Sequence, residues 1–122
     1  MRHERWINLC LRLTSKSKMP EHKHASVLVK GGKVLSIGIN KSKAGILADQ
    51  VYGLKGWHSE ADCLLSIHKD RIKDAVLYVG GVTKTKKLVN SKPCPCCQEF
   101  ISKYNLKGVF YHDQYGNVCQ YA

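Results

Sequence analysis

Two short segments carry residues whose types and spacing suit chemistry at a metal ion. One is His58-Ser59-Glu60, and the other contains Cys94 and Cys97. A structural zinc site normally has four protein ligands, whereas a catalytic site has three and leaves a position for water or substrate. A histidine, two cysteines and a neighbouring carboxylate therefore predict a catalytic zinc site. Glu60 is then suited to take a proton from water and pass it to a leaving group.

The spacing of the cysteines indicates which of them are expected to bind the metal. Cys94 and Cys97 lie three residues apart, so on a helix they share a face, whereas Cys96 points away from Cys94. Pro93 suits the start of such a helix, where its missing N–H has no cost. Thiolates near a helix N-terminus are also stabilised by the helix dipole. The pattern predicts that Cys96 is not a ligand.

Neither segment is decisive alone. A single Cys-x-x-Cys pair is also typical of a redox pair or of half a zinc ribbon, and a His-x-Glu triplet occurs by chance. The arguments used for the cysteines place His58 at the start of another helix, with Ser59 and Glu60 in its first turn. Because a redox pair leaves His58 and Glu60 without a role, the two segments together favour catalysis.

Hydrophobic patterns place both segments in a series of helices and strands. The predicted helices span residues 4–13, 60–68 and 94–104. The predicted strands span residues 26–29, 34–39, 75–79, 108–112 and 118–121. Residues 40–57 form a long irregular stretch, which in a compact domain is usually functional, and residues 80–92 a basic loop. This order predicts a three-layer α/β/α fold with a mixed five-stranded sheet.

Length and composition indicate one domain over residues 1–122, since 122 residues that are 43% hydrophobic usually form a single core. The chain has no cleavable signal pattern and no apolar run long enough to cross a bilayer, so we expect a cytoplasmic protein without a membrane partner. The close spacing of the cysteines around Cys94 fits metal chemistry better than a disulfide framework. Cys10, Cys63 and Cys119 are expected to be core residues.

The net charge of +11 favours phosphorylated or polyanionic partners, because cationic clefts concentrate anions. It does not identify the anion, and each lysine cluster also fits an ordinary solvated surface. The clusters are Lys16, Lys18 and Lys23, then Lys41 and Lys43, and then Lys84, Lys86, Lys87 and Lys92.

Through these two motifs, the chain resembles the cytidine deaminase-like superfamily of zinc-dependent nucleoside and nucleotide deaminases. The match covers essentially the whole chain and is specific in the His-x-Glu and Pro-Cys-x-x-Cys motifs, but only topological elsewhere. The resemblance implies a Zn2+ ion held by His58, Cys94 and Cys97. It also implies that Glu60 is the catalytic proton shuttle.

The resemblance also implies residues that contact the substrate. Asn40 matches an asparagine that contacts the substrate sugar, although it is equally suited to capping a turn. Trp57 is a candidate wall for the substrate ring or a core residue. Ser59 stands where the family usually has a small apolar residue, and its hydroxyl is available to bond the substrate or to help cap the helix.

Two cues about the substrate conflict. Histidine as the first ligand resembles the deoxycytidylate, tRNA adenosine and polynucleotide cytidine deaminases, whereas the closing hairpin resembles the free-nucleoside branch. We expect hydrolytic deamination of a cytosine nucleotide such as deoxycytidylate, most similar in metal motif to deoxycytidylate deaminase. The phosphate would then meet Lys41, Lys43, Arg71 or Lys92.

Two other functions stay open. One is a deaminase of cytosine or adenine in single-stranded DNA or RNA, for which a basic surface would follow the backbone. The other is a zinc-stabilised binding module without activity, against which Glu60 argues. Small members of the superfamily often assemble, so we also expect a homo-oligomer.

Overall fold

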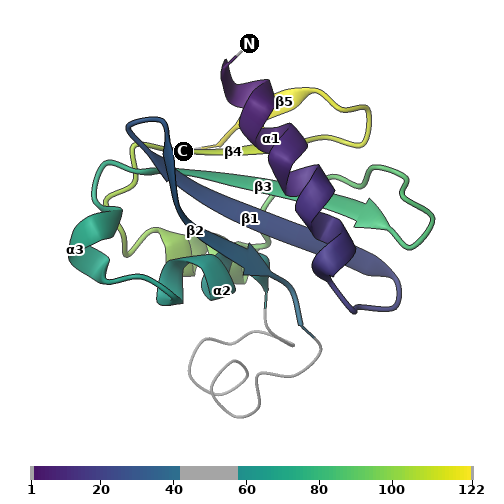
Figure 1. Ribbon diagram of the computed structural model, residues 1–122, viewed down its shortest axis with the longest axis horizontal. Coiled ribbons are helices and arrows are strands. Elements are labelled where there is room, and N and C mark those ends of the chain that lie inside the picture. The colour runs from purple at the N-terminus through teal and green to yellow at the C-terminus, as the bar shows by residue number, and fades with distance from the viewer. Residues whose placement is uncertain (1, 42–57, 122) are drawn as a thin grey trace.

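A mixed five-stranded sheet in the order β2-β1-β3-β4-β5 forms the centre of the protein, with helices on both faces (Figure 1). The computed structural model describes residues 2–41 and 58–121. The strands are β1 (His22–Lys30), β2 (Lys33–Ile39), β3 (Val76–Thr83), β4 (Gly108–His112) and β5 (Val118–Gln120). The helices are α1 (Arg2–Leu13), a 3₁₀ turn η1 (Thr14–Lys16), α2 (Ser59–Leu65), α3 (Lys69–Ile72) and α4 (Pro95–Ile101). The predicted α/β/α fold is confirmed.

The strand directions confirm both predicted hairpins. β1 runs antiparallel to β2 and β3, β3 runs parallel to β4, and β4 runs antiparallel to β5. The turn between β1 and β2 contains Gly31 and Gly32 with φ angles of 60° and 77°. This left-handed conformation suits a two-residue hairpin turn and is one that glycine adopts without strain.

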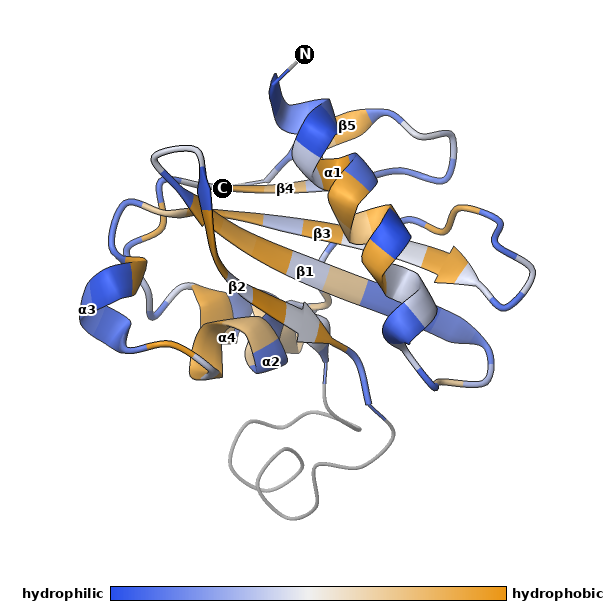
Figure 2. Cartoon of the chain, viewed as in Figure 1, coloured by the Kyte–Doolittle hydropathy of each residue, from blue (hydrophilic) through white to orange (hydrophobic). Residues whose placement is uncertain are grey.

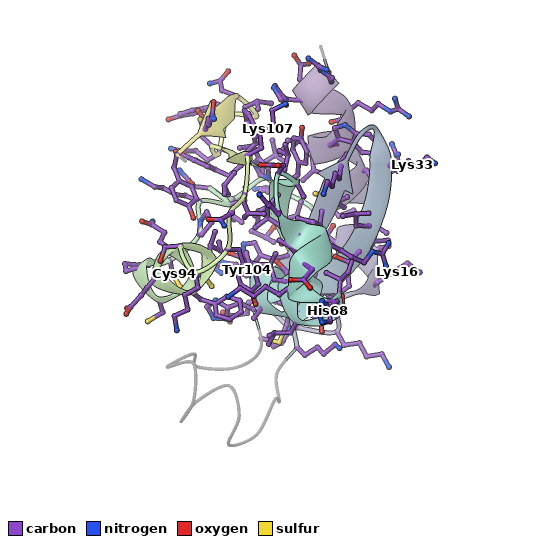
Figure 3. The ribbon with its side chains drawn as sticks, turned by 90° about the vertical axis from the view of Figure 1, so that its left-hand side faces the viewer. Lys16, Lys33, His68, Cys94, Tyr104 and Lys107 are labelled. Atoms are coloured by element: carbon purple, nitrogen blue, oxygen red, sulfur yellow. The ribbon has the colours of Figure 1, made fainter. Side chains whose placement is uncertain are left out.

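The two faces of the sheet bury separate groups of side chains. On one face Trp6, Ile7 and Cys10 of α1 pack against Val27 and Tyr78. On the other face α2 and α4 pack against alternate residues of the same strands, among them Leu28, Leu77 and Val79. The apolar residues lie where helices meet the sheet, and Figure 3 shows α1 and α4 on opposite sides (Figures 2 and 3).

Strand β3 extends past its predicted end. Residues 80–83 were expected to begin a basic loop, but Gly80 and Gly81 pair with Ala25 and His24 of β1. A Cβ atom on Gly80 would lie 2.7 Å from the Cβ atom of Cys10. Glycine is therefore needed here because α1 crosses the strand closely, and not because the chain turns. β1 begins at His22, four residues before its predicted start, because residues 22–25 pair with residues 80–83 of the longer β3.

α2 and α4 are shorter than predicted, whereas α1 begins two residues earlier than predicted. α2 ends at Leu65, where the Ser66 hydroxyl donates to the Cys63 carbonyl (2.9 Å), and α3 is a separate turn. α4 begins with Pro95 in its first turn, so the expectation that Pro93 begins this helix was wrong. Cys119 is only half-buried because β5 is an edge strand. Within the described residues no helix has the length and apolarity needed to cross a membrane.

Helix α2 approaches β2 most closely at Gly38. A Cβ atom there would collide with the backbone oxygen of Ser59 and the backbone nitrogen of Cys63, and would lie 2.7 Å from the Cys63 Cβ atom. Backbone atoms cannot move aside as the end of a long side chain can. Gly38 therefore sets the distance between α2 and the sheet.

We expect Gly38→Ala to lower the free energy of unfolding by about 1–3 kcal/mol, because the added methyl group forces α2 away from β2. Urea unfolding of the metal-free protein measures this. The matched control is Ile37→Ala, because Ile37 is 43% exposed and its truncation should cost less than about 1 kcal/mol. Wild-type stability of Gly38→Ala would contradict this close packing.

Candidate active site

The first turns of α2 and α4 bring the three predicted ligands together. His58 is the N-cap of α2 and Cys94 is the N-cap of α4, each with an extended backbone. Cys97 lies in the first turn of α4. Nδ1 of His58 is 3.1 Å from Sγ of Cys97 and 3.7 Å from Sγ of Cys94. The three ligand atoms all lie within 4.8 Å of one another.

This cluster fits Zn2+. In a tetrahedral zinc site with ordinary bond lengths, neighbouring nitrogen and sulfur ligands lie roughly 3.5–3.8 Å apart. The distances from His58 Nδ1 to the two sulfur atoms are close to this range, and two thiols with one imidazole form a donor set that zinc prefers. Nδ1 is the imidazole nitrogen that faces the thiols. Cys96 is exposed and lies outside the cluster.

Burial makes the Cys97 thiol hard to ionise without a cation. Desolvation, followed by the negative charges of Glu60 and Cys94, raises the pKa of the Cys97 thiol. Without a cation this thiol therefore keeps its proton. Because a metal binds the thiolate, metal binding displaces the proton, and metal affinity must fall as the pH falls.

Glu60 lies beside the cluster but is held by a different set of atoms. Its side chain is buried, and Oε1 accepts a hydrogen bond from the Ser59 hydroxyl (3.0 Å). The Ser59 oxygen lies 2.7 Å from the hydroxyl oxygen of Ser26 in β1. Ser59 thus bonds the neighbouring carboxylate, a use of its hydroxyl different from the two that the sequence suggested.

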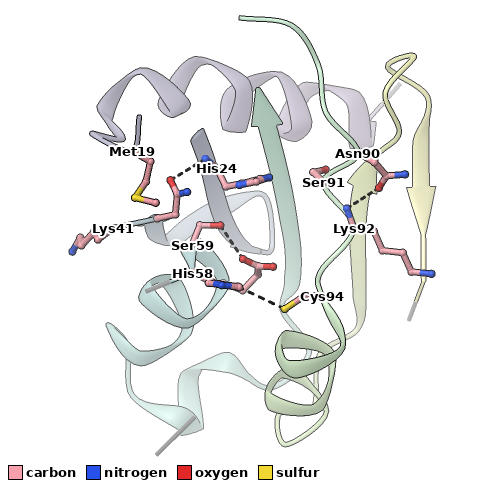
Figure 4. A pocket seen from close by; sticks show the side chains of 11 residues that line it. Met19, His24, Lys41, His58, Ser59, Asn90, Ser91, Lys92 and Cys94 are labelled. Carbon is pink, nitrogen blue, oxygen red and sulfur yellow. Dashed lines mark hydrogen bonds between the residues drawn. The ribbon is translucent and has the colours of Figure 1, made fainter. Parts of the chain in front are cut away.

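A pocket opens above these residues (Figure 4). His58, Ser59 and His24 lie on one side, and Asn90, Ser91 and Lys92 lie opposite, on the segment that follows β3. Ser91 is held in place, since its hydroxyl donates to the Val79 carbonyl (2.8 Å). The pocket therefore has walls from α2 and β1 on one side and from this segment on the other.

Asn40 lines the pocket, although most of its amide is already bonded. Its Oδ1 atom accepts from the Ser17 hydroxyl (2.6 Å) and from the His24 backbone N–H (3.0 Å). Its Nδ2 atom donates to the His22 carbonyl (3.0 Å). An amide has two N–H bonds and two oxygen lone pairs, so, among residues 2–41 and 58–121, one N–H remains without a partner. Asn40 therefore ties the turn after α1 to β1 and keeps one donor.

His24 is a pocket residue that the sequence analysis missed, because the strand was expected to begin at Ser26. Alternation along β1 puts His24 on the same face as Ser26, which contacts Ser59. Burial, with smaller effects from the charges of neighbouring histidines, lowers the pKa of His24 to about 4. Near pH 7 it therefore lines the pocket as a neutral imidazole. The available signal was the position of His24, two residues before Ser26, because alternate residues of a strand lie on the same face.

Two of the four cations proposed for a phosphate line the pocket. Lys41 does so, but its ammonium group bonds Asp62 (3.1 Å). Lys92 also lines the pocket, and no ion pair is found for it among the described residues. Arg71 lies on α3 and does not line the pocket. Lys43 and the predicted ring contact Trp57 lie outside the described residues.

The chain matches a family model over residues 1–113, described as the cytidine and deoxycytidylate deaminase zinc-binding region. The chain belongs to this family. The residues that form the ligand cluster all lie inside the matched range. Family membership and the cluster together support zinc-dependent deamination of cytosine.

Solved structures of deaminases share the fold. A cytidine deaminase from Burkholderia pseudomallei is similar with a TM-score of 0.69 and 21% identity, over 100% of this chain and 93% of that one. The apo dCMP deaminase of the cyanophage S-TIM5 is similar with a TM-score of 0.58 and 20% identity, over 92% and 80%. At such identities the likeness establishes the fold alone. No curated protein matches the chain.

We expect the purified protein to bind about one zinc ion per chain. Cys97→Ser should lose most of this zinc, because only two ligands of the cluster remain, whereas Cys96→Ser should keep it. Elemental analysis after dialysis against a weak chelator measures the content. Loss of zinc in Cys96→Ser with retention in Cys97→Ser would reverse the ligand assignment.

Proposed function

We propose that the protein catalyses the zinc-dependent hydrolytic deamination of a cytosine nucleotide, deoxycytidylate or a close relative, with release of ammonia. The observation that carries this proposal is the position of Glu60. Its carboxylate is 5% exposed and lines the same pocket as His58 and Cys94, yet it is not part of the three-ligand cluster. A carboxylate next to a metal but not bound to it is suited to proton transfer.

The residues divide the chemistry between them. His58, Cys94 and Cys97 would hold zinc, which acts as a Lewis acid and makes a water molecule acidic enough to react near neutral pH. Glu60 accepts a proton from this water, whose oxygen attacks the ring carbon bearing the amine. Glu60 passes this first proton to the ring nitrogen, then accepts the second proton of the same water from the hydroxyl group now on the ring carbon and passes it to the departing amine, so that ammonia leaves and a carbonyl remains.

Residues at the pocket opening support a nucleotide as the substrate. The free N–H of Asn40 suits a sugar hydroxyl, and the Lys92 ammonium group suits a single phosphate. The dCMP deaminase of the cyanophage S-TIM5, crystallised with dCMP and dUMP, has the same fold with a TM-score of 0.56. We therefore favour a free nucleotide over a polynucleotide, which engages several cations at once.

Glu60→Gln should keep its zinc and its fold while losing nearly all turnover, because an amide does not accept and return protons. Ammonia release from deoxycytidylate, measured per zinc-loaded protein, tests this. Glu99→Gln is the matched control, since Glu99 is exposed on α4, and it should retain wild-type activity. Near wild-type turnover by Glu60→Gln would remove the basis of the deaminase proposal.

Lys92→Gln should raise KM for deoxycytidylate roughly 3- to 10-fold, because one exposed phosphate contact is lost. KM for deoxycytidine should not change, because the nucleoside has no phosphate. Lys84→Gln, an exposed lysine outside this pocket, should alter neither value. Equal effects on nucleotide and nucleoside would contradict a phosphate contact.

A panel of substrates separates the free nucleotide from nucleic acid. Affinity for a mononucleotide should fall gently with salt, whereas affinity for a single strand falls with a log-log slope of about 0.7 per phosphate neutralised. Efficient deamination of single-stranded DNA or RNA, without activity on millimolar deoxycytidylate, would show that the basic surface serves nucleic acid.

A further inference from the structure

Two serines connect the sheet to the carboxylate of Glu60. Ser26 lies in β1 and Ser59 is the first residue of α2, and each is 0% exposed. Their hydroxyl oxygens are 2.7 Å apart, and Ser59 Oγ is 3.0 Å from Oε1 of Glu60. We call Ser26 and Ser59 the serine pair. Burying a hydroxyl group or a carboxylate costs free energy unless that group is hydrogen-bonded.

The hydrogen bonds of the serine pair have one direction. The Ser59 hydroxyl has a single proton, and it donates this proton to Oε1 of Glu60. Ser59 then has only its lone pairs left for Ser26, and Ser26 must be the donor between them. The proton order is therefore fixed, from Ser26 to Ser59 and from Ser59 to Oε1.

This order distinguishes the two carboxylate oxygens. Oε1 of Glu60 is held by Ser59, and Ser59 is in turn held by the rigid centre of the sheet. Ser59 does not hold the other oxygen, Oε2, which is therefore the oxygen suited to the reacting proton. Because transfer requires heavy atoms within about 2.6–3.2 Å, a carboxylate that rotates freely spends much of its time in unproductive orientations.

We propose that Ser59, supported by Ser26, is a positioning residue that fixes the carboxylate of Glu60 so that Oε2 carries the proton during deamination. This inference rests on the proposed function.

Ser59→Ala should lower kcat roughly 10-fold or more, as expected for the loss of one hydrogen bond to a charged group, while KM and zinc content stay near wild type. Ser26→Ala should lower kcat by a smaller factor, roughly 2- to 5-fold, because Ser59 still donates to Glu60. In Ser26→Ala/Ser59→Ala, removal of Ser26 should have no further effect, since Ser26 acts only through Ser59. Rates are measured per zinc-loaded, folded protein.

Ser36→Ala is the matched structural control. The Ser36 hydroxyl donates to the Cys63 carbonyl (2.9 Å), so it also joins a strand to α2, but it does not contact Glu60. This variant should lose stability and keep its kcat. If Ser26→Ala and Ser59→Ala lower kcat additively, or no more than Ser36→Ala does, the serine pair is merely structural and the proposal is wrong.

A second readout does not depend on turnover. The infrared difference spectrum between wild type and Glu60→Gln isolates the carboxylate bands of Glu60, and Ser59→Ala should shift the separation of these bands. A shift together with a lowered kcat supports the proposal. A shift with unchanged kcat, or no shift, overturns it. If the wild type deaminates no substrate in the panel, the proposed function fails, whereas the spectrum still reports whether Ser59 holds the carboxylate.

Discussion

The whole site depends on the side-by-side placement of the first turns of α2 and α4. Each helix has seven residues, too few to be stable alone in water, so packing on the sheet must hold both. Leu64 of α2 and Phe100 and Ile101 of α4 are buried in one core with Leu28 and Leu77 of the sheet. The three ligands come from helix starts 36 residues apart in sequence, and only this shared core brings them together. Ligand geometry is therefore a consequence of sheet packing.

The electrostatics of the site differ from those of the chain. The net charge is +11, yet the ligand cluster contains two cysteines and lies beside the buried side chain of Glu60. The raised pKa of Cys97 reflects desolvation by burial first and then the charges of Glu60 and Cys94, and a divalent cation would stabilise the thiolate against both. Of the cations that line the pocket, Lys41 is already paired with Asp62. A count of basic residues thus overstates the positive charge available to a substrate phosphate.

Sequence patterns predicted the ligand-bearing segments well because these depend on local rules. Residues that begin helices need particular neighbours, and the three-residue spacing of Cys94 and Cys97 has a fixed meaning on a helix. The limits of β1 and β3 were predicted poorly because they depend on packing. Gly80 suggested a turn, whereas the structure needs it where α1 crosses, and this longer strand pairing extends β1 back to His22. Contacts between distant segments leave no such local pattern.

The polar side chains of Asn40 and Glu60 at the pocket already form several hydrogen bonds within the protein. The oxygen of Asn40 accepts from Ser17 and His24, and within the described part of the chain only one of its two N–H groups has a partner. One oxygen of Glu60 is used by Ser59, which leaves the other. Groups fixed in this way need no reorganisation when a ligand binds, and catalysis gains most from such fixed dipoles and donors. Groups fixed in this way also restrict the orientation in which a ligand can bind. In the proposed reaction, a cytosine nucleotide would bring its sugar hydroxyl to Asn40, and the attacking water molecule would bring a proton to Glu60.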